Sequence, residues 1–171
     1  MKIEFKNIIL VIMVGLAILS RLIPHPFNFT PIGALALFGT VYFNNKFTGA
    51  ILTFCVMLIS DFLIGFHSSM IWVYGAFALI CLIGIWLKDN LSIISTLTSS
   101  LLASITFFII TNFGVWVASG MYTMDYTGFI ACYVAAIPFF GNTLGGDLFY
   151  VTILFGSFEL ARRTFLKQKL A

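Results

Sequence analysis

The sequence predicts an all-α membrane protein in which six transmembrane helices form one bundle, with both termini in the cytoplasm. Of its 171 residues, 61% are hydrophobic and 9% are charged, whereas about 25% of a soluble domain is charged. Apolar segments alternate with short polar gaps, and lysine and arginine occur in every second gap, as in the cytoplasmic loops of membrane proteins. The basic residues of these gaps are Lys2 and Lys6, then Lys46, then Lys88, and finally Arg162, Arg163, Lys167 and Lys169. This alternation favours an even number of crossings, most simply six.

The first two predicted spans cover residues 7–20 and 31–43 and are joined by a proline-rich loop. No small-residue cleavage site follows the first apolar run, which ends at Arg21, so we interpret it as a retained helix rather than a signal peptide. Three prolines in the loop exclude a continuous helix, and Thr30 and Pro31 are well placed to begin the second span. This span is shorter than the ~20 residues that cross a ~30 Å hydrocarbon layer. It is therefore either shielded by neighbouring helices or one arm of a re-entrant hairpin, and the charge alternation favours a short span.

The third, fourth and fifth spans are predicted over residues 47–66, 70–87 and 92–117. A glycine-containing turn ends the third span, and a basic turn at Lys88 closes the fourth on the cytoplasmic side. The inner half of the fifth span is rich in serine and threonine, whose hydroxyl groups bond their own backbone or a neighbouring helix.

The rest of the chain, after a polar loop at residues 119–127, is too long for one straight span, and Pro138 interrupts it. We expect a short outer or re-entrant helix over residues 128–137, because an apolar run of that length is more often re-entrant than spanning. A sixth span over residues 139–160 then leads to the basic tail. The whole chain, residues 1–171, makes a single transmembrane domain and leaves no room for a soluble catalytic or nucleotide-binding domain.

Composition and motifs exclude several classes of function. The net charge of +3 comes from the predicted cytoplasmic ends and indicates orientation and lipid contact rather than nucleic-acid binding. The three cysteines lie in apolar segments at spacings that match no metal motif. Residues 141–147 are glycine-rich but lack the Lys-Ser/Thr of a phosphate-binding loop, and no metalloprotease or serine-hydrolase motif occurs. We therefore expect no metal, no cofactor and no enzymatic activity.

Polar and aromatic residues of the outer half of the predicted bundle share one level. Charged side chains are costly inside a bilayer, face the bundle interior and mark candidate functional sites. The candidate substrate-binding residues are Arg21, His25, Asn28, Asp61, His67, Asn112, Trp116, Asn142 and Asp147. An aromatic wall with a few convergent polar groups is typical of a small-molecule pocket, so we expect a substrate pocket near the extracytoplasmic face.

Each of these residues also has a purely structural interpretation. Arg21 can pair with Asp61 or Asp147 only to neutralise a buried charge. The asparagines can form hydrogen bonds between helices, the histidines can be packed or solvated in their loops, and Trp116 can belong to an interfacial belt. Both interpretations stay open at this point.

Four stretches resemble an uncharacterised family of small bacterial membrane proteins. They are RLIPHPFNFTPIGALALFGTVYF, SDFLIGFH, NFGVW and CYVAAIPFFGNTLGGDLFYVTILFG. That family is similar in layout to the substrate-binding S components of energy-coupling-factor (ECF) transporters. The resemblance implies six helices with both ends inside and a vitamin or similar micronutrient bound near the outer face, with residues 24–31 as a lid. It also implies partners, namely a membrane T subunit and a pair of ATPases that drive the substrate inward.

These observations predict a multi-pass protein of the cell (inner) membrane that binds and takes up a small molecule. Its partners would be the substrate and the lipid bilayer, and no nucleic acid. The chain has no ATPase motif, so energy must come from partners unless the protein is a passive carrier. Three alternatives remain: an ion-coupled carrier that uses Asp61 or Asp147, a structural or assembly subunit of a membrane complex, and an integral-membrane enzyme. The identity of the substrate does not follow from the sequence.

Overall fold

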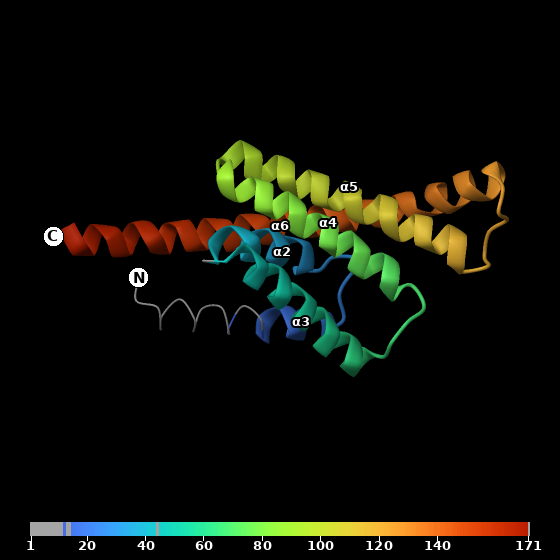
Figure 1. Cartoon of the computed structure of the whole chain (residues 1–171), viewed down its shortest axis with the longest axis horizontal. Coiled ribbons are helices and arrows are strands. Elements are labelled where there is room, and N and C mark those ends of the chain that lie inside the picture. Colours follow the sequence, from blue (N-terminus) through green and yellow to red (C-terminus); the bar gives the residue numbers. More distant parts are fainter. Residues whose placement is uncertain (1–11, 13–14, 44, 171) are drawn as a thin grey trace.

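The computed structural model describes residues 12, 15–43 and 45–170, and all regular secondary structure in these ranges is helical (Figure 1). Of the predicted first span, residues 12 and 15–20 are described and helical, and the helix continues to residue 22. Lys2, Lys6 and the beginning of that span lie outside the described residues, as do the side chains of Lys46 and of residues 164–170. The described part of the chain is all-α, as predicted.

Five helices follow the first. They are α2 (Ile32–Tyr42), α3 (Lys46–Ile64), α4 (Met70–Asp89), α5 (Ile93–Ala118) and α6 (Tyr126–Leu170). Among the described residues, α3, α4, α5 and α6 are long and apolar enough to cross a membrane. Large apolar side chains on these helices are exposed, including Phe62, Ile71 and Ile93, as expected for surfaces that face lipid rather than water. The helices therefore have the length and composition of a membrane protein.

The expectation of a separate short helix before the sixth span is wrong. α6 runs without interruption over 45 residues and contains Pro138. A helix of this length measures about 68 Å, more than twice the ~30 Å of a hydrocarbon layer, and its C-terminal part projects well beyond the other labelled helices (Figure 1). Proline removes a single backbone hydrogen bond from a helix, and membrane helices tolerate it, so Pro138 does not end α6.

α2 is the centre of the bundle. Ten of its 11 residues are buried, and it contacts α3, α4, α5 and α6. At about 17 Å it is too short to cross a bilayer by itself. Because other helices surround it, α2 needs no apolar surface of bilayer length, which is the shielded arrangement that the sequence left as one of two alternatives.

Glycines let α3 and α4 approach α2 closely. A Cβ atom at Gly49 of α3 would overlap the backbone of Gly39 and Thr40 in α2, and a Cβ atom at Gly84 of α4 would overlap the side chain of Thr40. Such contacts matter in membrane proteins because close van der Waals packing, rather than the hydrophobic effect, drives association between helices.

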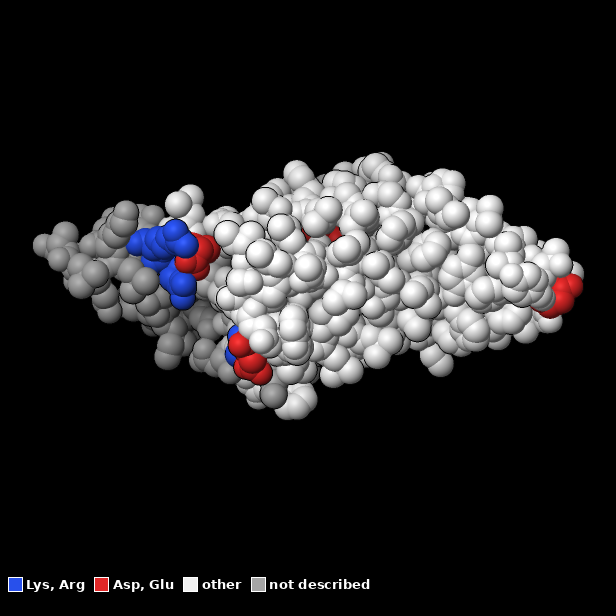
Figure 2. Space-filling model, turned by 90° about the horizontal axis from the view of Figure 1, so that it is seen from above, with Lys and Arg blue, Asp and Glu red and all other residues white. Residues whose placement is uncertain are grey.

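The two ends of the bundle differ in charge. The α3–α4 and α5–α6 connections lie at one end, which we term the loop end, and the α4–α5 connection lies toward the other, which we term the basic end (Figure 1). At the basic end, Arg162 and Arg163 both pair with Glu159, each at 2.9 Å. Figure 2 shows the described lysine and arginine side chains of one face gathered toward this end, and an acidic side chain at the loop end. The charge alternation along the sequence thus corresponds to a separation of charges between the two ends of the bundle.

At the loop end, Asp125 caps the beginning of α6. Its Oδ1 atom accepts hydrogen bonds from the backbone N–H of Gly128 at 2.7 Å and from the hydroxyl of Thr123 at 2.8 Å. These bonds, that of Gly128 foremost, hold the pKa of the exposed Asp125 carboxyl below its ordinary value. Asp125 is therefore a helix cap and not only a solvated loop charge.

The Gly39–Gly49 contact makes a testable prediction. Gly49→Ala should destabilise the protein by about 1–3 kcal/mol, because the added methyl group would overlap the α2 backbone. Gly75→Ala in α4 is the control, since nothing lies within 4 Å of a Cβ atom added there and alanine favours a helix over glycine by about 1 kcal/mol. Thermal unfolding of the purified variants in detergent measures both effects. A Gly49→Ala protein as stable as Gly75→Ala would contradict the close α2–α3 contact.

Candidate functional site

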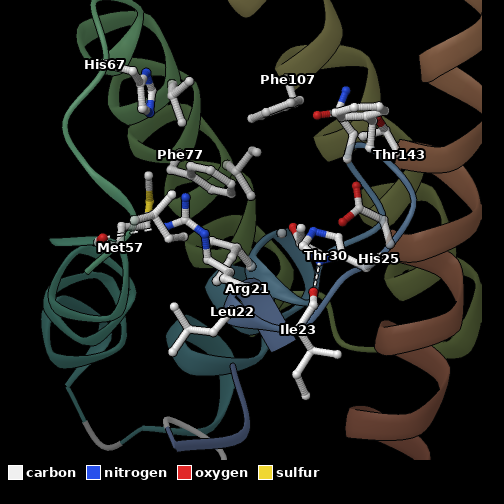
Figure 3. A pocket seen from close by; sticks show the side chains of 18 of the residues that line it. Arg21, Leu22, Ile23, His25, Thr30, Met57, His67, Phe77, Phe107 and Thr143 are labelled. Carbon is white, nitrogen blue, oxygen red and sulfur yellow. Dashed lines mark hydrogen bonds between the residues drawn. The ribbon is translucent and has the colours of Figure 1, made fainter. Parts of the chain in front are cut away.

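A hollow of about 550 Å³ lies between the first helix, the segment 23–31 and helices α2, α3, α4, α5 and α6 (Figure 3). We term it the loop-end cavity. Its apolar wall includes Ile32, Met57, Val73, Phe77, Ile80 and Phe107, and its polar residues are Arg21, His25, Asn28, Thr30, His67, Thr143 and Asp147. Figure 3 shows Arg21 and Phe77 on one side of the hollow and Thr143 on the other. The volume lies within the roughly 300–1,000 Å³ of small-molecule sites.

Arg21 of the first helix is partly buried and forms an ion pair with the buried Asp61 of α3. Its Nη2 atom lies 2.7 Å from Asp61 Oδ1, and the two side chains are 18% and 2% exposed, respectively. The hydroxyl of Tyr74 donates to Asp61 Oδ2 at 2.8 Å, and Arg21 Nη1 donates to Ser60 Oγ and to the carbonyl of Met57. The pair and its partners therefore join the first helix to α3 and α4. Of the two partners that the sequence offered Arg21, the structure selects Asp61.

Asp147 of α6 also lines the cavity, but in the described part of the chain it has no ion-pair partner of the kind that Asp61 has. It is 5% exposed, and its Oδ2 atom accepts a hydrogen bond of 2.6 Å from the hydroxyl of Ser104 in α5. A Cβ atom at Gly33 of α2 would overlap Asp147 Oδ1, so the absence of a side chain at this position leaves space for the carboxylate. Among the described residues, no cation pairs with Asp147.

The segment 23–31 borders the cavity and is held against α6 by aromatic contacts. The ring of Phe27 lies 5.9 Å from that of Phe139, and the ring of Phe29 lies 5.8 Å from Phe149 and 5.7 Å from Tyr150. Between the two anchors, Asn28 adopts a positive φ of 64°, a conformation that asparagine tolerates better than most residues. This turn places Asn28 on the cavity wall.

Two predicted histidines line the cavity but are engaged within their own loops. His25 Nδ1 donates to the carbonyl of Ile23 at 2.7 Å, and His67 Nδ1 lies 2.9 Å from Ser69 Oγ. Among the described residues no group of three or more histidine, cysteine or acidic side chains could hold a metal ion.

The remaining predicted residues, Asn112, Trp116 and Asn142, do not line the loop-end cavity. A smaller hollow of about 220 Å³ adjoins the loop-end cavity, shares Asn28, Val73, Phe107 and Thr143 with it, and is also lined by Asn112. Asn112 Nδ2 donates to the Phe108 carbonyl of its own helix at 2.7 Å. Trp116 and Asn142 line neither hollow; the indole N–H of Trp116 is bonded to Thr123 O at 2.9 Å.

Helical spacing explains why Thr143 rather than Asn142 reaches the cavity. Residues four positions apart on a helix lie on one face, so Thr143 shares the face of Asp147, whereas Asn142 points elsewhere. That spacing was a usable signal in the sequence. Ser104, Tyr74 and Gly33 carry no comparable signal, because their roles depend on how α5, α4 and α2 are rotated against the helices that bear Asp147 and Asp61.

The Arg21–Asp61 pair predicts a coupling between two substitutions. Arg21→Met should cost about 3–5 kcal/mol, because it leaves the buried Asp61 carboxylate without its cation. Asp61→Asn should cost less, since the Arg21 side chain that it leaves unpaired is 18% exposed and the amide keeps an acceptor for Tyr74. The double variant should be more stable than Arg21→Met alone. Unfolding of the four proteins in detergent measures this cycle, and strictly additive effects would contradict the ion pair.

Comparison with known proteins identifies a family. Residues 1–170 match the family described as "Family of unknown function (DUF6580)". No curated protein and no solved structure matches the chain. Because the family match covers nearly the whole chain, this protein belongs to the DUF6580 family.

Proposed function

We propose that this protein binds a small molecule in the loop-end cavity and mediates its uptake, in the manner of an ECF S component. The cavity is the observation that carries the proposal. It joins an apolar and aromatic wall to polar groups that come from the first helix, the segment 23–31 and α6, which is the composition of small-molecule sites. A purely structural bundle would gain packing energy by filling a hollow of about 550 Å³.

The segment 23–31 is the proposed lid. Its two phenylalanine anchors on α6 are ring contacts, and the backbone hydrogen bonds around its turn are local, from Phe29 N to Pro26 O at 3.0 Å and from Thr30 N to Asn28 O at 3.1 Å. The segment can therefore swing away from the cavity without breaking a helix, which would admit and release a ligand.

The proposed topology is six crossings with both termini in the cytoplasm of a bacterial cell and the loop end outside the inner membrane. Lys88, Arg162 and Arg163 at the basic end support this orientation through the preference of basic residues for the cytoplasmic side. The cavity then opens toward the outside, where the substrate is supplied. A T subunit with two ATPases would drive the inward step.

The second candidate function is an ion-coupled carrier, and the buried Asp147 beside the cavity favours it. Intramembrane carboxylates mark proton and ion pathways in transporters. The two candidates differ in energy source. Uptake that collapses with an uncoupler and survives ATP depletion supports the ion-coupled carrier, and the opposite pattern supports an ATP-driven module.

Occupancy of the cavity can be tested without knowing the identity of the ligand. Native mass spectrometry of the gently purified protein should show a retained small molecule. Val73→Phe should lower the retained amount, because Val73 lines both hollows and the larger ring would take up part of their space. Ile71→Phe is the matched control, since Ile71 lies on the same helix with a side chain that is 76% exposed, and it should retain the molecule. The proposal fails if no protein carries an adduct, or if Val73→Phe carries as much as the control.

A further inference from the structure

The charges around the loop-end cavity do not balance. Arg21 is neutralised by Asp61 at 2.7 Å, and its remaining contacts go to Ser60 and the Met57 carbonyl. Asp147 lines the same cavity and has no cationic partner among the described residues. The other titratable groups of the wall, His25 and His67, are engaged within their own loops. The cavity therefore has one excess carboxylate.

Such a carboxylate is expensive where it lies. Asp147 is 95% removed from solvent, since its exposure is 5%, and an unpaired charge inside a membrane protein costs several kcal/mol. The hydroxyl of Ser104 relieves part of this cost through one hydrogen bond to Oδ2. The remainder requires either a proton on the carboxylate or a cation beside it.

The cavity supplies the room for a cation, since Asp147 lines its hollow of about 550 Å³. Oδ1 packs closely against Gly33 of α2 on one side, and no hydrogen bond from a described residue reaches this oxygen. Phe77 and Phe107 form part of the same wall, and aromatic faces attract cations. A carboxylate with one free oxygen in an aromatic cavity is a suitable site for an ammonium group.

We propose that the ligand of the loop-end cavity is an organic cation whose ammonium group binds the Asp147 carboxylate. The inference rests on the proposed function and names the chemical class of its substrate. Arg21 is the less suitable site for a charged ligand, because Asp61 already neutralises its charge. Asp147 is thus the residue that determines specificity, and Gly33 and Ser104 position it.

The experiment compares two probes of the same shape and opposite charge. Tryptamine carries an ammonium group, and 3-indolepropionate carries a carboxylate on the same indole ring and two-carbon linker. Radiolabelled tryptamine at about 1 mM, the range of a weak ligand, should bind the purified full chain, and unlabelled 3-indolepropionate should not displace it. Asp147→Asn should weaken tryptamine binding about tenfold or more, the loss expected for a charged hydrogen bond. Asp125→Asn, in the α6 cap, should bind as the wild type does.

Several outcomes overturn the inference. It fails if tryptamine does not bind the wild type, if 3-indolepropionate displaces it as well as unlabelled tryptamine does, or if Asp147→Asn binds tryptamine unchanged. The last result would indicate that a proton already neutralises the carboxylate. The comparison of the two probes on the wild type tests the preference for a cation even if Asp147→Asn does not fold.

The failure of this inference is distinguishable from failure of the proposed function. A retained anionic molecule that is less abundant in Val73→Phe would overturn the cationic ligand and leave the binding cavity standing. The absence of a retained molecule from every protein would overturn the proposed function and, with it, this inference.

Discussion

A charge inside an apolar bundle must be compensated, and this constraint organises the part of the protein around the loop-end cavity. Arg21 and Asp61 compensate each other's charge, with Tyr74 and Ser60 as hydrogen-bond partners. Because the pair links the first helix to α3 and α4, it fixes the side of the cavity that the first helix forms. Asp147 meets the constraint only in part, through Ser104. The protein thus keeps one compensated pair of charges and one incompletely compensated carboxylate beside the same hollow, and the carboxylate gives the hollow its chemical preference.

The hollow itself follows from the length of α2. A central helix of 11 residues fills about 17 Å of the bundle, and its other end lies toward the basic end, where Lys88 Nζ donates to the Phe43 carbonyl at 2.8 Å. Its first residues, Ile32 and Gly33, reach the cavity wall. Beyond them the interior is bordered by the non-helical segment 23–31, of which residues 23–28 are exposed. A short buried helix and a proline-rich segment in series therefore leave space for a ligand between the longer helices.

The helices could be predicted from the sequence because hydropathy and turn residues are local signals. The bounds of α2 to α5 differ from the expected ranges by at most a few residues. Pro138 misled the prediction, since its effect on a helix depends on neighbours that the sequence does not reveal. Arg21, Asp61 and Asp147 could be selected because charges are rare in apolar segments. Their pairing could not, because the contacts of Asp61 with Tyr74 and of Asp147 with Ser104 depend on the rotation of separate helices.

The central claim is that the loop-end cavity is a wet hollow open to the outside of the cell. The most direct measurement is labelling of Thr143→Cys by a membrane-impermeant methanethiosulfonate reagent in intact cells, with Cys55, Cys81 and Cys132 replaced by serine. Thr143 lines the cavity, and Ile109→Cys is the control, because Ile109 is exposed on the outer surface of α5 two residues from the cavity-lining Phe107. We expect Thr143→Cys to react from outside and Ile109→Cys not to react. A Thr143→Cys protein that reacts only after the membrane is permeabilised, or not at all, would contradict it.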